Sequence, residues 1–364
     1  MLIFMIFRRL IMKKILAIIV ALATTMAFAT ACNEKTDVSD ASNTEAETSD
    51  TQASESSEDT EATEPSTAES DMLDRAGNGI VLPEKIEKIV SMAPSTTQVL
   101  IEIGLADKIV GIDTNSVTYI ADLSADVAQF DMMSPDNEAI AALDPDIVFT
   151  SGMSSAGGTS PFQSLIDSGV CVADIPSSAS IADIAEDIRF IGTVTGKESE
   201  AEDLVEAMNL YISAVEDIAK TVPEGEKKTV LLMMNVPSAE FPTIYTVGKG
   251  TYMDEMFGII GAENAFGSQE GWLSISIEEA LAADPDVILM DCNWMPGADE
   301  AVKALEGWEN VTAVKNGDVY QIDEDLCSRP NHHVAEACAE WAKCIYPDQF
   351  NEFNMTLELM AEAA

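Results

Sequence analysis

Residues 137–148 read NEAIAALDPDIV, and residues 277–288 read IEEALAADPDVI. In each stretch a glutamate, Glu138 or Glu278, is followed seven residues later by Pro-Asp and then by β-branched apolar residues. Proline ends a helix because it cannot donate a backbone hydrogen bond, and the apolar run after it is typical of a buried strand. The sequence therefore predicts the same helix-to-strand unit at two places in the chain.

The segments around these two stretches also repeat in the same order. Lys88 lies 50 residues before Glu138, and Lys228 lies 50 residues before Glu278. In both halves, apolar segments of strand length alternate with segments of helical periodicity. This alternation predicts parallel sheets that have helices on both faces and right-handed crossovers.

A long helix is predicted between the two halves, over residues 197–222. Its apolar side chains recur at helical spacing, and Pro223 and Gly225 end the pattern. At 1.5 Å per residue such a helix is about 37 Å long, which is enough to run along both halves. We therefore expect an α/β protein of two lobes, residues 73–196 and 223–364, joined by this helix as a rigid connector.

Residues 1–31 have the pattern of a secretory signal peptide. From Met12, which we expect to be the true start, two lysines precede a short apolar run that ends in small residues. The phrase Ala29-Thr30-Ala31-Cys32 resembles a bacterial lipobox, so Cys32 is predicted to carry lipid. The alternative is plain cleavage that leaves Cys32 as an ordinary thiol.

Residues 32–72 are predicted to be a disordered tether that begins at Cys32. After the cysteine they contain 13 acids, 15 serines or threonines and one lysine, so almost nothing in them can be buried. Repulsion between like charges extends such a segment. The whole chain has a formal net charge of −45, which argues against nucleic acid as a partner because nucleic acid is itself an anion.

The cysteines and histidines show no metal-binding spacing. Five cysteines follow Cys32, and no two of them form a C-x-x-C pair. The only two histidines are the adjacent His332 and His333, which cannot by themselves form a multi-histidine cage. We therefore expect no intrinsic cofactor and no site for a bare transition-metal ion.

Six segments together resemble the solute-binding proteins of ABC importers for iron-siderophores, haem and vitamin B12. They are KIVSMAPSTTQVL (88–100), GLADKIVGID (104–113), NEAIAALDPDIV (137–148), the 197–221 helix, SIEEALAADPDVI (276–288) and AVKNGDVYQID (313–323). The resemblance covers about residues 74–350. It implies two Rossmann-like lobes with parallel central sheets, one rigid helix between them, and a ligand held in the cleft.

The resemblance also implies the protein's partners and location. It implies a monomer without enzymatic activity that delivers its ligand to an ABC permease dimer and the associated ATPase. Together with lipid on Cys32, it implies anchoring to the cell membrane at the extracytoplasmic face.

One glutamate on each lobe of this family docks onto arginines of the permease, and the resemblance places Glu138 and Glu278 in that role. Arginine suits such contacts because its planar fork bonds both carboxylate oxygens. The alternative is that each acid only stabilises the first turn of its helix. Glu279 has a structural role of its own, because Ser276 and Glu279 have the spacing of a capping box.

The resemblance further implies that the ligand contacts the loops that follow the strands, as is general for open α/β sheets. The candidate cleft residues in these loops are Ser95, Asn115, Met132, Met133, Met153, Trp272, Trp294, Arg329 and His332.

Some of these residues bear on the choice of ligand. Met132 and Trp272 stand six residues before the docking glutamates, where vitamin B12 binders tend to have tryptophan, so that match is partial. Methionine or histidine could supply an axial ligand to haem. Arg329 is the one basic residue of these loops, which favours a chelate of low or positive charge. We expect a ferric siderophore or similar metal complex, with cobalamin or haem as alternatives.

The alternatives to a binding protein are a secreted hydrolase and a surface protein without ligand. The segment GMSSAGG (152–158) does not satisfy Gly-x-Ser-x-Gly, and a serine triad would have to use one of the two adjacent histidines. Gln98 departs from the family, which usually has glutamate there, so one polar contact near the cleft differs. A binding protein rather than an enzyme is the function that the sequence favours.

Overall fold

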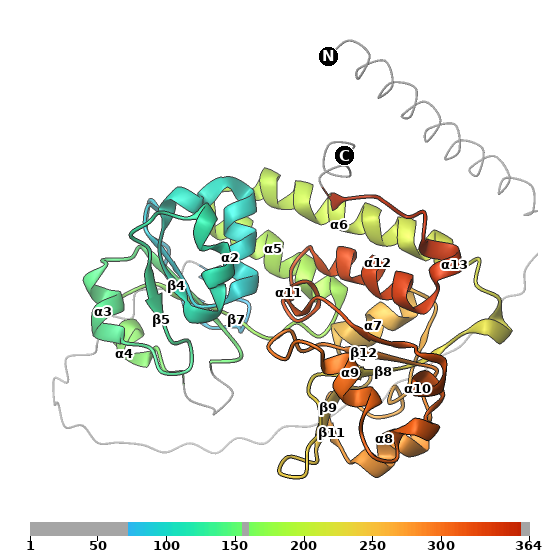
Figure 1. Cartoon of the computed structure of the whole chain (residues 1–364). Helices are drawn as coiled ribbons and strands as arrows, with labels where there is room; N and C mark the ends of the chain where they lie inside the picture. Colours follow the sequence, from blue (N-terminus) through green and yellow to red (C-terminus); the bar gives the residue numbers. More distant parts are fainter. Residues whose placement is uncertain (1–71, 155–159, 358–364) are drawn as a thin grey trace, which may run out of the picture. The chain divides into compact units, whose positions relative to one another are not determined.

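The computed structural model describes residues 72–154 and 160–357. They belong to one compact unit, residues 66–364, which contains two α/β lobes (Figure 1). The predicted signal peptide, Cys32 and the predicted tether up to residue 71 lie outside the described residues. Within the described ranges, no helix has the length and apolar character needed to cross a membrane.

The first lobe is built on a parallel sheet of five strands in the order β5-β4-β3-β6-β7. The strands are β3 (Ile89–Ser91), β4 (Ile109–Asp113), β5 (Ala128–Phe130), β6 (Ile147–Ser151) and β7 (Val172–Ile175). A short antiparallel hairpin precedes the sheet in sequence, formed by β1 (Met72–Leu73) and β2 (Gly79–Ile80). The order reverses between β3 and β6, as in Rossmann folds, and ligands bind beyond the carboxyl ends of the strands at such a reversal.

Helices connect these strands. They are α2 (Pro94–Leu100), the turns η1 (Ile101–Leu105), η2 (Ala106–Lys108) and η3 (Thr114–Asp122), and the helices α3 (Asn137–Ala142), α4 (Gln163–Asp167) and α5 (Ile181–Thr195). The sequence sets the ends of α5 clearly. The Ser180 hydroxyl caps its start by accepting the Asp183 amide, and Gly196 ends it at a positive φ of 69°, a conformation that favours glycine.

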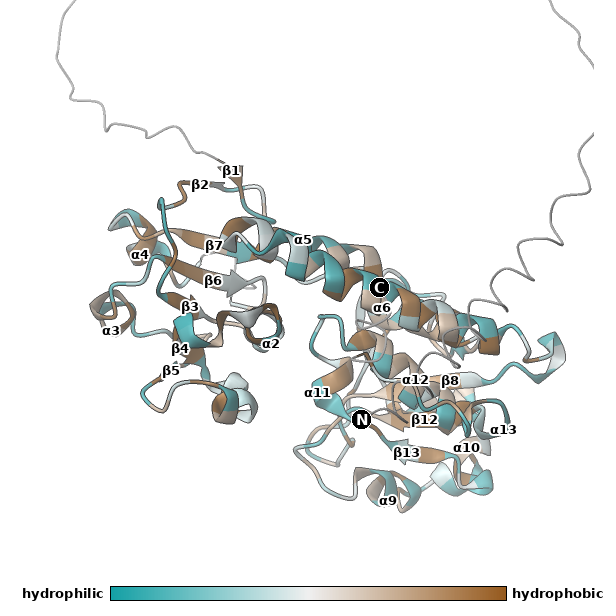
Figure 2. Ribbon diagram, turned by 90° about the horizontal axis from the view of Figure 1, so that it is seen from above, coloured by the Kyte–Doolittle hydropathy of each residue, from teal (hydrophilic) through white to brown (hydrophobic). Residues whose placement is uncertain are grey.

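Helix α6 (Glu198–Ala219) is the connector, and it packs against helices of both lobes. It contacts α5 in the first lobe and, in the second, α7 (Tyr252–Ile259), α12 (Val334–Ile345) and α13 (Pro347–Phe350). Figure 1 shows α5, α6 and α12 side by side, and Figure 2 shows hydrophilic and hydrophobic residues mixed along α5 and α6. Because α6 is packed along its length, it is a stiff connection rather than a loose hinge.

The second lobe is built on a parallel sheet of four strands in the order β10-β8-β12-β13. The strands are β8 (Thr229–Met233), β10 (Glu263–Asn264), β12 (Val287–Met290) and β13 (Val319–Gln321). The remaining helices and turns of this lobe are η4 (Glu224–Glu226), α8 (Ile277–Ala283), α9 (Ala298–Lys303), η5 (Trp308–Asn310), α10 (Thr312–Asn316) and α11 (Glu324–Cys327). The predicted α/β fold of two Rossmann-like lobes on one connector helix is thus confirmed.

One element of the second lobe differs from the prediction. Trp272 was expected to lie in a loop, but Trp272–Ile275 is strand β11, paired antiparallel with β9 (Ile244–Val247). Trp272 and Ser274 are exposed, whereas Leu273 is half-buried and Ile275 is buried, which is the pattern of a strand with one face in solvent. The run is only four residues long, so its alternation is easily missed in the sequence.

The repeated phrase forms the same local structure in both lobes. Asp144 and Asp284, each directly before the proline, adopt positive φ angles of 53° and 41° and so end their helices. The next aspartate of each copy holds the start of the neighbouring strand. The carboxylate of Asp146 accepts the amides of Glu87 and Lys88, at 2.6 and 2.8 Å.

In the second lobe Asp286 accepts the amide of Thr229 at 2.9 Å. The Pro-Asp steps are therefore structural. They tie the strand that follows each short helix to the first strand of its sheet, β3 or β8.

Candidate functional site

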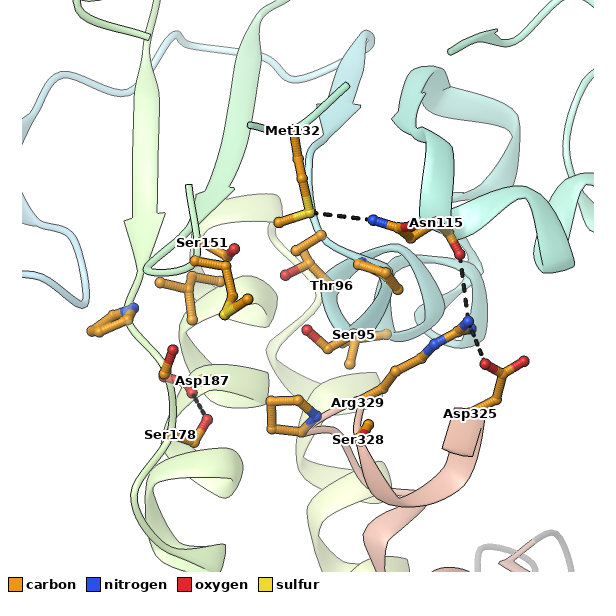
Figure 3. A pocket seen from close by; sticks show the side chains of 18 of the residues that line it. Ser95, Thr96, Asn115, Met132, Ser151, Ser178, Asp187, Asp325, Ser328 and Arg329 are labelled. Carbon is orange, nitrogen blue, oxygen red and sulfur yellow. Dashed lines mark hydrogen bonds and ion pairs between the residues drawn. The ribbon is translucent and has the colours of Figure 1, made fainter. Parts of the chain in front are cut away.

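A cavity of about 540 Å³ opens at the carboxyl ends of the first lobe's strands (Figure 3). All five strands contribute to its wall, either by their last residue or by the loop that follows. These wall residues are Ala93, Pro94, Ser95 and Thr96 after β3, Thr114, Asn115 and Val117 after β4, Met132 after β5, Ser151 and Met153 from β6, and Ile175, Pro176, Ser177 and Ser178 from β7. The cavity therefore lies where the strand order predicts a ligand.

The second lobe closes the cavity with the segment around α11. Its contributions are Glu324, Asp325, Ser328, Arg329 and Pro330. Residues more than 200 positions apart in the sequence thus line one space, and a ligand in it would contact both lobes.

Arg329 is the main link across the cavity. Its guanidinium forms an ion pair of 2.5 Å with Asp325 and donates to the Thr118 hydroxyl at 3.0 Å and to the Asn115 carbonyl at 3.4 Å. It also donates to the Tyr119 hydroxyl and lies 5.0 Å from the centre of that ring. Figure 3 shows the side chain extended from the second lobe towards Asn115. Its charge is therefore already compensated.

The charges of the wall are otherwise negative. Among the described residues that line the cavity, Arg329 is the single lysine or arginine, against the acids Asp187, Glu324 and Asp325. Asp187 forms an ion pair of 2.6 Å with Arg75 and accepts the Ser178 hydroxyl at 2.8 Å. Burial raises the pKa of Asp187, and these partners oppose the increase. The wall thus offers no uncompensated cation to an anionic ligand.

The rest of the wall combines apolar side chains with hydroxyls. Met132 is 8% exposed, and its sulfur accepts a hydrogen bond of 3.5 Å from the Asn115 amide. The Ser151 side chain lines the cavity, and its buried hydroxyl has no hydrogen-bonding partner in the described part of the chain. Apolar walls with a few placed polar groups are typical of small-molecule sites.

Five predicted cleft residues line this cavity: Ser95, Asn115, Met132, Met153 and Arg329. Four others lie outside its wall. Met133, Trp272 and Trp294 are exposed to 56, 53 and 65%, and His332 is 1% exposed. Met133 follows Met132 directly in the bend after β5, but only Met132 reaches the cavity.

His332 differs from the expectation because the structure buries it between the lobes. Its Nε2 lies 2.7 Å from Glu102 Oε2, and Nε2 of His333 lies 2.8 Å from Glu102 Oε1. Burial lowers the pKa of His332. Burial also lowers that of His333, but hydrogen bonds to Glu102 and Glu336 outweigh it and raise the pKa to about 9.

Sequence reasoning missed the part of the wall contributed by α5. Asp187, Ile188 and Ile191 lie on one face of this helix and reach the cavity. A signal was present: Asp187 interrupts the apolar face of a helix, between Ile184 and Ile188, where an acid needs a partner.

Both predicted docking glutamates are exposed, one on each lobe. Glu138 is in the first turn of α3 and Glu278 in the first turn of α8. The predicted capping box is confirmed, since Ser276 accepts the Glu279 amide and the Glu279 side chain accepts the Ser276 amide. Glu278 takes no part in that box, so its carboxylate is available at the surface.

Comparison with known proteins gives the family. Residues 89–326 match the model of the periplasmic binding protein family. The chain is 32% identical over 279 residues to the uncharacterized ABC transporter substrate-binding lipoprotein YvrC of Bacillus subtilis, covering 77% of this chain and 86% of that protein. It is 23% identical over 281 residues to a cobalamin-binding protein of Halobacterium salinarum, covering 75% and 73% of the two chains.

A comparison with solved structures gives the same family. A possible iron-binding (periplasmic solute-binding) protein from Staphylococcus epidermidis matches with a TM-score of 0.62 and 28% identity, over 72% of this chain and all of that one. The chain therefore belongs to the periplasmic binding protein family, as a non-enzymatic, substrate-binding component of ABC import of the iron and vitamin B12 type.

Proposed function

We propose that this protein captures a neutral or cationic metal chelate in the cavity between its lobes and delivers it to an ABC permease and its ATPase. A ferric siderophore of low charge or a similar complex is the first candidate, with cobalamin as an alternative. Haem, the other alternative, carries two propionates, so the charge of the wall disfavours it. Lipid on Cys32 would hold the protein at the outer face of the cell membrane, within reach of the permease.

The proposed charge of the ligand rests on the charge of the cavity wall. The guanidinium of Arg329 is already paired with Asp325, and the wall has three acids to this one cation. A ligand with several negative charges would lose its hydration without gaining a free cation in return, and burying unpaired charge is costly. A neutral or cationic complex meets no such penalty.

The size and polarity of the cavity support the same class. A space of about 540 Å³ is within the range of small-molecule sites. Hydroxyls of wall residues such as Ser95 can bond a chelate, while Val99, Ile188 and Ile191 can contact its organic shell. The relative from Halobacterium salinarum is a cobalamin-binding protein, which keeps cobalamin among the candidates.

Delivery is proposed to depend on Glu138 and Glu278. Both are exposed and lie at matched positions of the two lobes. Glu138 follows Lys88, and Glu278 follows Lys228, at the same spacing of 50 residues. Two carboxylates on separate lobes could contact two basic pockets at once. Such a contact would report whether the lobes are held in the arrangement that encloses the ligand.

Calorimetric titration of the full chain, purified in mild detergent, tests the ligand class. The panel is a cationic and a neutral ferric trihydroxamate, a trianionic ferric tris-catecholate, cobalamin and haem. We expect saturable binding of one neutral or cationic complex and much weaker binding of the tris-catecholate. Preference for the trianionic complex would contradict the charge argument.

A pair of variants places binding in the cavity. Ser95→Phe puts a ring into the space, whereas Ser164→Phe adds the same ring to an exposed position of α4 outside the wall. Only the first should abolish binding. Equal affinity of both variants would show that the ligand binds elsewhere.

A further inference from the structure

A second cluster of reactive side chains lies between the lobes, outside the cavity wall. Glu102, on turn η1 of the first lobe, meets His332 and His333, which directly precede α12 in the second. The two contacts join residues 230 and 231 positions apart in the sequence. Adjacency of the histidines argued against a metal site, but folding adds a third group that the sequence does not place beside them.

Each of the three side chains contributes one potential metal-ligand atom, and these atoms lie close together. One ring nitrogen of His332, one of His333 and a carboxylate oxygen of Glu102 all lie within 4.8 Å of one another. In both histidines Nε2 is the nitrogen that lies next to the Glu102 carboxylate, at 2.7 and 2.8 Å. Zinc binds imidazole nitrogen at about 2.0–2.1 Å and carboxylate oxygen at about 2.0–2.2 Å. Ligand atoms spaced this closely need only small side-chain rotations to surround one ion.

Glu336 holds the His333 ring in an orientation suited to metal binding. Its Oε2 lies 2.6 Å from Nδ1 of His333, on the side of the ring away from Glu102. A carboxylate that accepts the Nδ1 proton fixes the ring and leaves Nε2 to bind metal, which is the usual arrangement around metal-bound histidine. Glu336 is itself in the first turn of α12 and also accepts the Leu357 amide at 3.5 Å.

The cluster is open to solvent on one side. The side chain of Glu102 is 33% exposed and that of His333 is 17% exposed, while His332 is at 2%. An ion could therefore enter past Glu102 and keep a water molecule as its fourth ligand. Two histidines, one carboxylate and one water form a known zinc ligand set.

We propose that Glu102, His332 and His333 form a binding site for one divalent transition-metal ion of the zinc type. The ion would join the first lobe to the second, a few residues from Arg329, and would stabilise their contact without entering the chelate cavity. The site is independent of which chelate the cavity holds.

Zinc titration of the full chain, purified in mild detergent and freed of metal with a chelator, tests the site. We expect one tightly bound Zn²⁺ per chain, and characteristic visible absorption bands when Co²⁺ replaces it. Glu102→Gln and His333→Gln should each weaken zinc binding at least about tenfold, and Glu336→Gln about tenfold. Glu87→Gln, at an exposed acid, is the control and should leave the affinity unchanged.

Glu102→His separates metal ligation from simple ion pairing. It replaces one metal ligand by another of similar reach but removes the acceptor that both histidines now share. Retained zinc binding in this variant, with loss in Glu102→Gln, supports the site. A wild-type chain that binds no zinc tightly, or variants that bind it as well as the wild type, would overturn the proposal and leave the cluster as hydrogen-bonded ion pairs.

Discussion

The carboxylate of Asp291 is predicted to make the stability of the second lobe depend on pH. Asp291 follows β12 and is 2% exposed. It accepts hydrogen bonds from the Ser328 hydroxyl at 2.6 Å and the Cys327 thiol at 3.1 Å. Burial raises its pKa from 3.8 to about 6, and the nearby carboxylates Glu324 and Asp323 add to the increase.

The direction in which stability changes with pH follows from the direction of this pKa shift. The folded state holds the proton more tightly than the unfolded state, so between pH 3.8 and about 6 the unfolded state loses its proton first. Folding is therefore favoured below the unfolded pKa, and this contribution is lost as pH rises through the folded value. A shift from 3.8 to about 6 corresponds to about 3 kcal/mol, since each pKa unit is about 1.4 kcal/mol.

Asp291→Asn removes the titration while keeping the shape of the side chain. We expect the free energy of unfolding of the wild type, relative to that of this variant, to fall by about 3 kcal/mol from about pH 3 to about pH 7. Urea unfolding followed by tryptophan fluorescence measures it, because all four tryptophans are in the second lobe and Trp308 and Trp341 are buried. Glu306→Gln, at an exposed acid of the same lobe, is the matched control.

A difference between wild type and Asp291→Asn that stays constant over this pH range would refute the reasoning. It would mean that the hydrogen bonds from Ser328 and Cys327 fully compensate the burial of the charge.

Three further predictions concern the wall of the cavity and the second aspartates of the repeated phrase. Arg329→Ala should weaken binding of the cavity's chelate at least about tenfold in calorimetry, because it removes the contacts to Thr118 and Asn115 that hold the two sides of the wall together. Unchanged affinity would contradict this. Gly152→Ala should also weaken binding, since its Cβ would lie 2.9 Å from the Ser177 nitrogen and displace part of the wall. In urea unfolding, Asp146→Ala should lower the free energy of unfolding more than Asp286→Ala, by about 2 against 1 kcal/mol, because Asp146 bonds two amides and Asp286 one. Equal losses would contradict this prediction.

Most of the fold could be predicted because local patterns specify it. The Pro-Asp steps, the apolar runs after them and the helical periodicity of residues 197–222 are all visible in the chain itself. Strand β11 was missed because its register depends on a partner, β9, that no local pattern identifies. The reversal of strand order then places the cavity at the carboxyl ends of the sheet.

Side-chain placement in the site was predictable only in part. Met132 lines the cavity and Met133 does not, although they are neighbours in the same loop, because the backbone turns only one of them inward. Asp187 was missed because its role depends on Arg75, 112 residues away. Likewise, the role proposed for Glu102 could not be predicted, because it depends on His332 and His333, which only the folded second lobe places beside it.

The most direct test of the whole account is charge reversal at both docking positions. In cells that depend on this protein for uptake of the chelate identified by calorimetry, Glu138→Lys combined with Glu278→Lys should abolish uptake while leaving the affinity for the chelate nearly unchanged. Glu206→Lys combined with Glu309→Lys changes the net charge equally at two other exposed glutamates and should transport normally. Normal uptake by the first pair, or loss of uptake in both pairs alike, would contradict the assignment of Glu138 and Glu278 as the contacts to the permease.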